Sequence, residues 1–140
     1  MGLPSSGKTT LAEKLVEKLR SKSVSVTWFN ADEIRNQYND WDFSFEGRIR
    51  QSKRMANLAM ESNSEYVICD FVAPLKEMRY HFNADYIIWV DTIKSSLYQD
   101  TDAVFEPPKF YDVRVTEKDC ELWADHVLYD LLGDWTSGLL

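Results

Sequence analysis

The first nine residues carry a pattern suited to binding phosphate, Gly2-x-x-x-x-Gly7-Lys8-Thr9. Glycines at the two ends of such a loop allow successive backbone N–H groups to turn inward and hold phosphate oxygens. A lysine at this position reaches β- and γ-phosphate oxygens, and the hydroxyl after it takes a Mg²⁺ position. The pattern predicts a site for the cofactors ATP and Mg²⁺, with Lys8 as its catalytic cation, built from Gly2, Ser5, Ser6, Gly7, Lys8, Thr9 and Thr10.

A turn rich in Gly, Ser and Pro that only caps a helix is the alternative interpretation of this stretch. The residues that follow favour nucleotide binding, because Leu11, Leu15 and Leu19 recur four apart, as on one buried helical stripe. Nucleotide binding does not by itself imply phosphoryl transfer, so catalysis needs separate support.

Charged residues gather after the next apolar run, "SVSVTWF", which predicts a strand. Asp32 and Arg35 follow it at once, where a second substrate would approach the γ-phosphate. Four cations then crowd one predicted helix, which suits an anionic acceptor in an otherwise acidic chain. These cations are Arg48, Arg50, Lys53 and Arg54. A solvated helix face is the simpler interpretation for Arg50 and Lys53, whereas Arg48 and Gln51 lie three apart and can face one site.

Two apolar runs, "YVICDF" and "YIIWVD", each contain an acid at the carboxyl end. Asp70 either holds the Mg²⁺ shell beside the loop or caps a helix that begins near Pro74, and we favour the metal role. Asp91 is interpreted as structural, with a cap for the segment that follows as one such role. We expect the same of His81 and of His126, for which the pattern shows no partner.

Strands and helices alternate along the chain, which predicts an α/β domain with a mostly parallel sheet. Helices are expected after the loop, at "EGRIRQSKRMANLAME" with Ile49, Met55, Ala56 and Ala59 inward, at "PLKEMRYHF", and after Thr116 as cap until Gly133. The last of these would bury Cys120, Trp123, Ala124, Val127, Leu128 and Leu131. Strands are expected through Val24, Val26 and Trp28, at Tyr66–Phe71 and Tyr86–Asp91, and at "YDVRV".

The order of these motifs resembles the adenylyl-sulfate kinases. Their D-G-D-N-x-R segment is similar to residues 30–35, and their F-S-x-E-x-R-x-x-N-x-R-R block aligns with Phe43, Ser44, Glu46, Arg48, Gln51, Lys53 and Arg54. Their S-F-I-S-P looks like residues 70–74, and their Y-E-x-P looks like 105–108. The resemblance implies a three-layer P-loop kinase fold and ATP-dependent transfer of the γ-phosphate to the 3′-hydroxyl of adenylyl sulfate, which gives 3′-phosphoadenylyl sulfate.

The same resemblance implies roles for individual residues. Asp32 would act as base or orienting group near the acceptor hydroxyl, and Arg35 and Arg48 would hold the phosphosulfate. Phe43 would pack on the adenine, and Tyr98 would stack on it from the other side. The implied substrate-binding set is Arg35, Phe43, Arg48, Gln51, Phe71 and Tyr98, with Thr9 and Asp70 at the metal.

Three departures from the family pattern leave other functions open. The family's first Asp is Asn30, its serines at 70 and 73 are Asp70 and Ala73, and only "IKSSL" stands where a long basic lid is expected. Phosphoryl transfer depends on cations around the moving charge and on exclusion of water. A kinase for another small-molecule acceptor, or a nucleotide-binding regulatory protein without turnover, is therefore the alternative.

The composition limits the classes of partner. The 140 residues, 44% of them hydrophobic, fit one domain over 1–140. A net charge of -7 disfavours binding to nucleic acid or anionic membrane, because the summed charge repels polyanions. We find no signal peptide and no run long enough to span a membrane, and Cys69 and Cys120 read as reduced structural thiols, Cys69 within the core. We expect a cytoplasmic protein that binds a small-molecule nucleotide, and a homodimer is left open.

A phosphate loop of this kind normally follows a buried strand, yet only Met1 precedes Gly2. That first, central strand would lie between the runs at 66–71 and 86–91. About four buried apolar side chains would contribute roughly 6–12 kcal/mol, which rivals the net stability of about 5–15 kcal/mol for a whole domain. We expect the strand in a longer gene product, because the start was misassigned or the sequence is truncated, and insertion of a partner strand is the third alternative.

Overall fold

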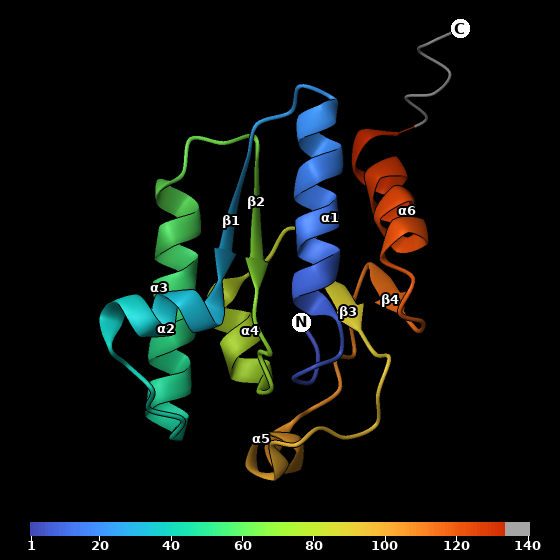
Figure 1. The fold of residues 1–140 in the computed structure, drawn as a ribbon. Coiled ribbons are helices and arrows are strands. Elements are labelled where there is room, and N and C mark those ends of the chain that lie inside the picture. The colour runs from blue at the N-terminus through green and yellow to red at the C-terminus, as the bar shows by residue number, and fades with distance from the viewer. Residues whose placement is uncertain (134–140) are drawn as a thin grey trace, which may run out of the picture.

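Helices and strands alternate along residues 1–133, which the computed structural model describes (Figure 1). The helices are α1 (Lys8–Ser21), α2 (Ala31–Tyr38), α3 (Phe45–Glu61), α4 (Lys76–Phe82), α5 (Gln99–Val104) and α6 (Cys120–Leu132). The strands are β1 (Val26–Asn30), β2 (Tyr66–Asp70), β3 (Ile88–Val90) and β4 (Val113–Val115). The predicted α/β class is therefore confirmed.

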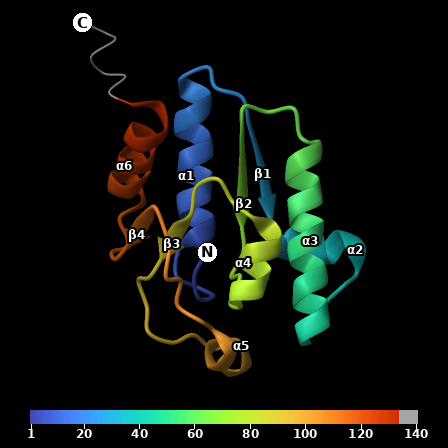
Figure 2. The same cartoon turned by 180° about the vertical axis from the view of Figure 1, so that it is seen from behind.

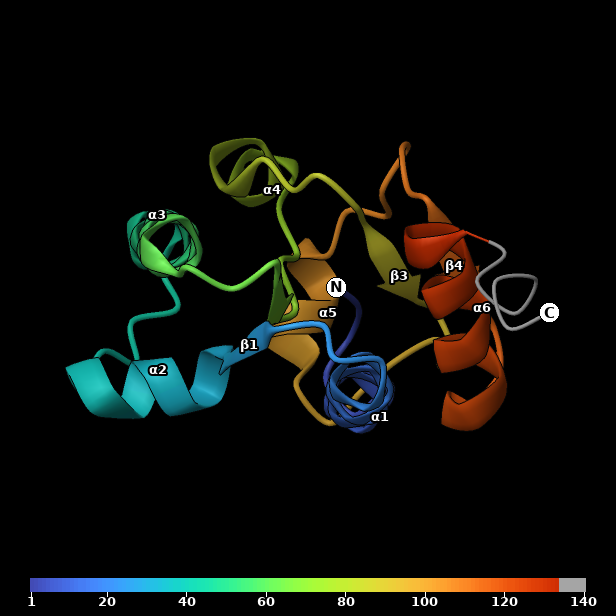
Figure 3. The same cartoon turned by 90° about the horizontal axis from the view of Figure 1, so that it is seen from above.

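The strands form two parallel pairs, β1 with β2 and β3 with β4. The amino-terminal backbone lies between the pairs, as the three views show (Figures 1, 2 and 3). The Met1 nitrogen donates to the Ile88 carbonyl at 2.8 Å, and the Met1 carbonyl accepts from the Val90 nitrogen at 2.8 Å. On the other side the Gly2 nitrogen donates to the Val72 carbonyl at 3.3 Å. The chain thus enters the loop at the predicted position, between the strands of the two apolar runs.

The alternation of side chains along β1 and β2 creates two cores on opposite faces. Val26, Trp28, Tyr66 and Ile68 pack with Val16 and Leu19 of α1. Phe29 and Cys69 face the other way, onto Met55 of α3 and its neighbours. A third cluster joins α1 and α6 to β3 and β4 through Leu11, Leu15, Val90, Val113 and Val127. Helices therefore cover both faces of the strands, in the three layers that were expected.

Several boundaries differ from the predictions for local reasons. The last helix begins after Asp119, whose carboxylate accepts from the Leu122 nitrogen, so Asp119 is its cap and Thr116 is not. Helix α4 begins at Lys76, two residues after Pro74. Strand β2 is only half-buried over 66–69, where full cover was expected, because no strand pairs with its second edge within the described residues. Helices α2 and α5 lacked a clear apolar period and were not predicted.

None of the helices in the described part of the chain is both long and apolar enough to cross a membrane.

Candidate active site

The phosphate loop curls between β3 and α1 with left-handed backbone at several positions. Gly2 has φ of +152°, and a Cβ there would lie 2.3 Å from the Val90 carbonyl oxygen, so only glycine fits against β3. Ser5 has φ of +65°, and Gly7, with φ of +105°, is the N-cap of α1. The N-terminal end of α1 therefore points its free N–H groups and positive dipole into the loop.

Two features of the loop suit an anionic ligand. The Ser6 hydroxyl is buried and has no hydrogen-bond partner among the described residues. Lys8 folds back onto the loop, where its Nζ donates to the Leu3 carbonyl at 2.9 Å. Burial lowers the pKa of Lys8, while the carboxylates of Asp70 and Asp32 oppose that shift. A phosphate in the loop would supply the anion that this desolvated ammonium lacks.

Thr9, Asn30 and Asp70 meet at the carboxyl ends of β1 and β2. The Thr9 hydroxyl donates to Asp70 Oδ2 at 2.8 Å, and Asn30 Nδ2 donates to the same oxygen at 2.9 Å. Asp70 is buried, whereas helix α4 has Leu75 as N-cap and no side-chain cap. The alternative in which Asp70 caps that helix is therefore wrong.

The donors at this corner are a hydroxyl and a carboxylate, the hard oxygen ligands that Mg²⁺ prefers. No cluster of three or more His, Cys, Asp or Glu side chains that would hold a metal occurs within residues 1–133. The residues present fit an ion held by one or two protein oxygens, waters and the phosphates of a nucleotide, as in other nucleotide-bound Mg²⁺ sites. Thr9 and Asp70 remain the proposed metal-side residues.

A cavity of about 410 Å³ opens beside the loop on the α6 side. Residues 5–11 form one wall, and the other residues that line it are Val90, Thr92, Val115, Glu117, Lys118, Asp119 and Cys120. Thr92 Oγ1 donates to the Ser6 carbonyl at 2.6 Å, and Lys118 Nζ donates to the Ser5 carbonyl at 3.2 Å. Neither residue was predicted from the sequence, because no local pattern indicates a contact between residues about a hundred positions apart.

On the other side of the loop, Phe43 lies between two buried arginines. The guanidinium carbon of Arg35 is 4.4 Å from the Phe43 ring centre, and that of Arg48 is 5.4 Å from it. Arg35 donates to the carbonyls of Asp40 (2.8 Å) and Asp42 (3.2 Å), and Arg48 Nε donates to the Phe43 carbonyl at 2.9 Å. The ring itself is half exposed. The structure thus brings together three residues of the predicted acceptor site.

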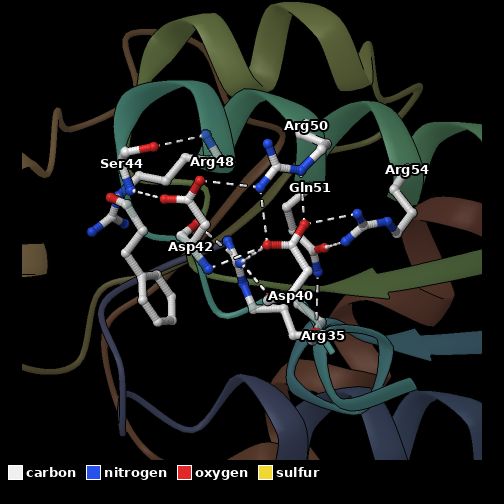
Figure 4. A network of polar contacts seen from close by, with 11 residues as sticks. Arg35, Asp40, Asp42, Ser44, Arg48, Arg50, Gln51 and Arg54 are labelled. Atoms are coloured by element: carbon white, nitrogen blue, oxygen red, sulfur yellow. Dashed lines mark hydrogen bonds and ion pairs between the residues drawn. The ribbon is translucent and has the colours of Figure 1, made fainter. Parts of the chain in front are cut away.

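Asp40 joins this site to the cations of α3 (Figure 4). Arg50 binds its carboxylate through Nε at 2.8 Å and a terminal nitrogen at 3.0 Å, and Arg54 binds it at 2.8 Å. The arginines hold the pKa of Asp40 well below its usual range. Arg50 and Lys53 are exposed, as the interpretation of a solvated helix face predicts, and Arg50 is in addition paired with the carboxylates of Asp40 and Asp42. The acids of "NDWDFS" beside an arginine-rich helix were the signal available in the sequence.

Gly47, in the first turn of α3, lies directly against this acidic loop. A Cβ at that position would meet the Asp42 carbonyl oxygen at 2.3 Å. The absence of a side chain lets the helix start close to residues 40–43, and Ser44 caps it by accepting from the Gly47 nitrogen at 3.1 Å. Ser44 and Gly47 therefore fix the start of α3, and with it the position of Arg48 in the first turn.

Five other predicted site residues lie less centrally. Asp32 is exposed in the first turn of α2, within electrostatic reach of Lys8. Gln51 is buried, and its amide is taken by the Ala31 carbonyl (3.1 Å) and by Arg54 (2.7 Å). Phe71 is buried in the α3-side core, edge-on to Phe82. Tyr98 is 61% exposed at the start of α5, and Thr10 is exposed on the first turn of α1.

The residues that were interpreted as structural lie outside the loop and the Phe43 corner. Asp91 and His126 nevertheless have acidic or basic partners that were not predicted. Asp91 binds Arg114 at 2.6 and 3.0 Å and caps nothing, and His126 lies 4.0 Å from Asp130 on the next turn of α6. Cys69 is half-buried on the α3 side, and burial raises the pKa of its thiol to about 12.

A wider surface cleft of about 770 Å³ lies outside α3. It shares Arg50 and Arg54 with the Asp40 network, but no loop residue lines it. Its position separates it from the loop, so the chemistry of the candidate site belongs to the cavity at 5–11 and the Phe43 corner.

Comparison with known proteins gives the family. A family model described as adenylylsulphate kinase matches residues 1–95. A probable adenylyl-sulfate kinase of Aeropyrum pernix is 38% identical over 81 residues, 56% of this chain and 44% of that protein. A cytidine diphosphoramidate kinase of Campylobacter jejuni is 31% identical over 84 residues, 59% of this chain and 49% of that one.

The fold has solved counterparts. The structure of the Mycobacterium tuberculosis APS kinase in complex with AMPPNP and APS superposes with a TM-score of 0.75 at 23% identity, covering 94% of each chain. That likeness shows the shared P-loop kinase fold. The chain spans about half the length of the curated relatives it matches. The family model covers well over half of the chain, and the protein therefore belongs to the adenylylsulphate kinase family.

Proposed function

We propose that the protein is an ATP-dependent kinase that transfers the γ-phosphate to the 3′-hydroxyl of adenylyl sulfate, giving 3′-phosphoadenylyl sulfate. One observation carries this proposal: the Thr9 hydroxyl beside the loop contacts Asp70 at the carboxyl end of β2, and the next elements present Phe43 against two buried arginines. An aromatic ring offers a surface for a base, and guanidinium groups hold an anion such as a phosphosulfate.

The chain's own residues would act mainly by placement and charge. Lys8 would leave the Leu3 carbonyl and bind the β- and γ-phosphate oxygens, with the N–H groups of the loop around them. Asp32 would orient the acceptor hydroxyl or accept its proton in an in-line attack. When bound, Mg²⁺ would neutralise developing charge on the same oxygens, held by Thr9 and, through water, by Asp70.

The direct test is a panel of acceptors with coupled detection of ADP. It should include adenylyl sulfate, other nucleotides and small alcohols. Turnover on adenylyl sulfate at the highest kcat/KM is the expected result. Turnover on another hydroxyl, with none on adenylyl sulfate, would retire this assignment.

Lys8→Ala should reduce phosphoryl transfer by at least about 10²–10³-fold, because a preorganised cation at the transferring phosphate is lost. The measurement is kcat with saturating ATP and acceptor. Lys14→Ala is the matched control on the same helix, since Lys14 makes only surface ion pairs with Glu17 and Glu121. Equal activity of the two variants would contradict the assigned role of the loop.

Arg48→Ala should weaken acceptor binding by about 10–100-fold, because a charge-assisted contact contributes about 1.5–3 kcal/mol. ATP affinity should change little. Calorimetric titration of each ligand separates the two effects, and Lys53→Ala on the exposed face of α3 is the control. An unchanged acceptor affinity in Arg48→Ala would show that the arginine–phenylalanine corner is not the acceptor site.

The acidic residues of α5 beside Arg48 favour a second class of acceptor, a nucleotide that carries less negative charge. Arg48 donates to the Thr101 hydroxyl of α5 at 3.4 Å, and the Asp100 carboxylate of the same helix lies within electrostatic reach of Arg48. A nearby carboxylate disfavours a highly anionic acceptor. A nucleotide with a less charged group would fit better, and the kinship with a cytidine diphosphoramidate kinase supports its inclusion in the panel.

A further inference from the structure

Where Thr9, Asn30 and Asp70 meet, the Asp70 carboxylate is held by a second side chain, Asn30, in addition to Thr9. Asn30 and Asp70 are direct partners in the β1–β2 ladder, at the last position of each strand. Both positions depart from the family pattern, which has an acid at 30 and a serine at 70. In this chain the carboxylate of the ladder step lies on β2 and the amide on β1.

The Asn30 amide can take only one orientation here. Its Nδ2 donates to Asp70 Oδ2 at 2.9 Å and approaches Thr9 Oγ1 at 3.3 Å, while its Oδ1 accepts from the Glu33 nitrogen at 3.1 Å as the cap of α2. A flipped amide would point an acceptor at a carboxylate and a donor at a backbone N–H. The helix cap therefore fixes the amide, and the amide fixes the carboxylate.

An aspartate in place of Asn30 would bring a second negative charge to within hydrogen-bond distance of Asp70. Two unshared carboxylates at that separation repel each other strongly. The asparagine removes this repulsion and supplies the donor that keeps the remaining carboxylate beside Thr9. The chain holds one carboxylate and one amide across this ladder step, and one carboxylate together with waters and phosphates is a usual ligand set for nucleotide-bound Mg²⁺.

We propose that Asn30 is a positioning residue that holds the Asp70 carboxylate beside Thr9 for the magnesium ion of a bound nucleotide. Asn30 and Asp70 form one amide–carboxylate pair, and the carboxylate would support the magnesium ion equally well if the two residues were exchanged between the strands. This inference rests on the proposed function, because it takes the loop to bind a magnesium nucleotide.

The experiment is a charge swap with binding readouts. AMPPNP affinity is measured by calorimetry with and without Mg²⁺ for the wild type, Asp70→Asn, Asn30→Asp, Asn30→Ser and the double variant Asn30→Asp/Asp70→Asn. Aspartate caps helices as well as asparagine does, so α2 keeps its cap in the swap. Thermal unfolding without nucleotide verifies that each variant is folded.

We expect Asp70→Asn to reduce the affinity gained from Mg²⁺ by about 10–100-fold, the usual cost of disturbing the surroundings of a bound metal. The double variant should recover most of that gain, because the carboxylate returns on the other strand. Asn30→Asp alone should bind Mg²⁺-free AMPPNP more weakly than the wild type, since a second negative charge faces the phosphates. Asn30→Ser keeps a capping oxygen but loses the amide donor to Asp70, so it should lower the gain from Mg²⁺, whereas a role for Asn30 in capping alone would leave that gain unchanged.

Three results would overturn the inference while leaving the proposed function intact. In the first, Asp70→Asn keeps the full gain from Mg²⁺. In the second, the double variant binds as poorly as Asp70→Asn. In the third, Asn30→Ser keeps the full gain. Failure of the wild type to bind AMPPNP under either condition would instead remove the proposed function, and this inference with it.

Discussion

At the scale of single residues, Asp40 ties the segment around Phe43 to the arginines of α2 and α3. Its carboxylate binds Arg50 and Arg54, and its backbone carbonyl accepts from Arg35. The loop that carries Phe43 is thereby tied to α2 and α3 at once. A cluster of arginines would repel itself, and this acid offsets that repulsion at its centre.

Asp40→Asn should lower the free energy of unfolding at pH 7 and leave little difference from the wild type in strong acid. The arginines lower the pKa of Asp40 in the folded state, so its carboxylate stabilises the fold above the unfolded pKa of about 3.9. That stabilisation is lost as pH falls from about 4 through the lower folded pKa. Urea unfolding between pH 7 and 2 measures it.

Asp85→Asn is the control for this comparison, because Asp85 is an exposed aspartate outside the network. It should unfold like the wild type at every pH. If the difference between Asp40→Asn and the wild type stayed constant down to pH 2, the carboxylate would not be the group that holds the arginines.

The sequence predicts residues whose role depends on local spacing and misses those that act at long range. Gly7, Lys8 and Thr9 could be assigned because loop and helix follow each other in the chain. Asp70 could be placed at a strand end, but its choice between metal and cap needed the contact with Thr9 across 61 positions. Lys118, which reaches the loop from before α6, carries no local signal at all.

At the scale of elements, the α3-side core supports the helices that carry Arg35 and Arg48 beside Phe43. Met55 of α3 is completely buried and packs with Ala31 and Ile34 of α2 and with Phe71 after β2. The arginines at 35 and 48 leave the two helices that this cluster joins. The helical period predicted Met55 as inward, whereas the buried polar Gln51 and Ser52 broke the apolar pattern and were not recognised as core.

Met55→Ala should reduce the free energy of unfolding by about 2–5 kcal/mol, because the substitution leaves a cavity between α2, α3 and β2. Met60→Ala is a matched control on the same helix, since the Met60 side chain is 83% exposed and its loss should change stability by no more than about 0.5 kcal/mol. Urea unfolding of both variants is the measurement. Equal effects would mean that α3 does not pack as described.

At the scale of the whole molecule, two residues of backbone bridge the strand pairs: Met1 bonds to β3, and the Gly2 nitrogen donates to the carbonyl of Val72, just beyond β2. Met1 donates to the carbonyl of Ile88 and accepts from the nitrogen of Val90, which is the hydrogen-bond pattern of a parallel ladder. Residues added before Met1 would therefore run parallel to β3, with the free edge of β2 on their other side. The phosphate loop begins at the end of this bridge, so its position depends on how firmly the pairs are held together.

Extension of the chain before Met1 by five β-branched apolar residues should raise the free energy of unfolding by several kcal/mol. Each buried side chain contributes about 1.5–3 kcal/mol as an upper estimate, and new ladder bonds join β2 to β3. AMPPNP affinity should rise as well, because a loop held from both sides loses less entropy on binding. An extension of five Gly and Ser residues controls for length and should do neither. Equal stability and affinity of the two extended chains would show that the space between β2 and β3 does not accept a strand.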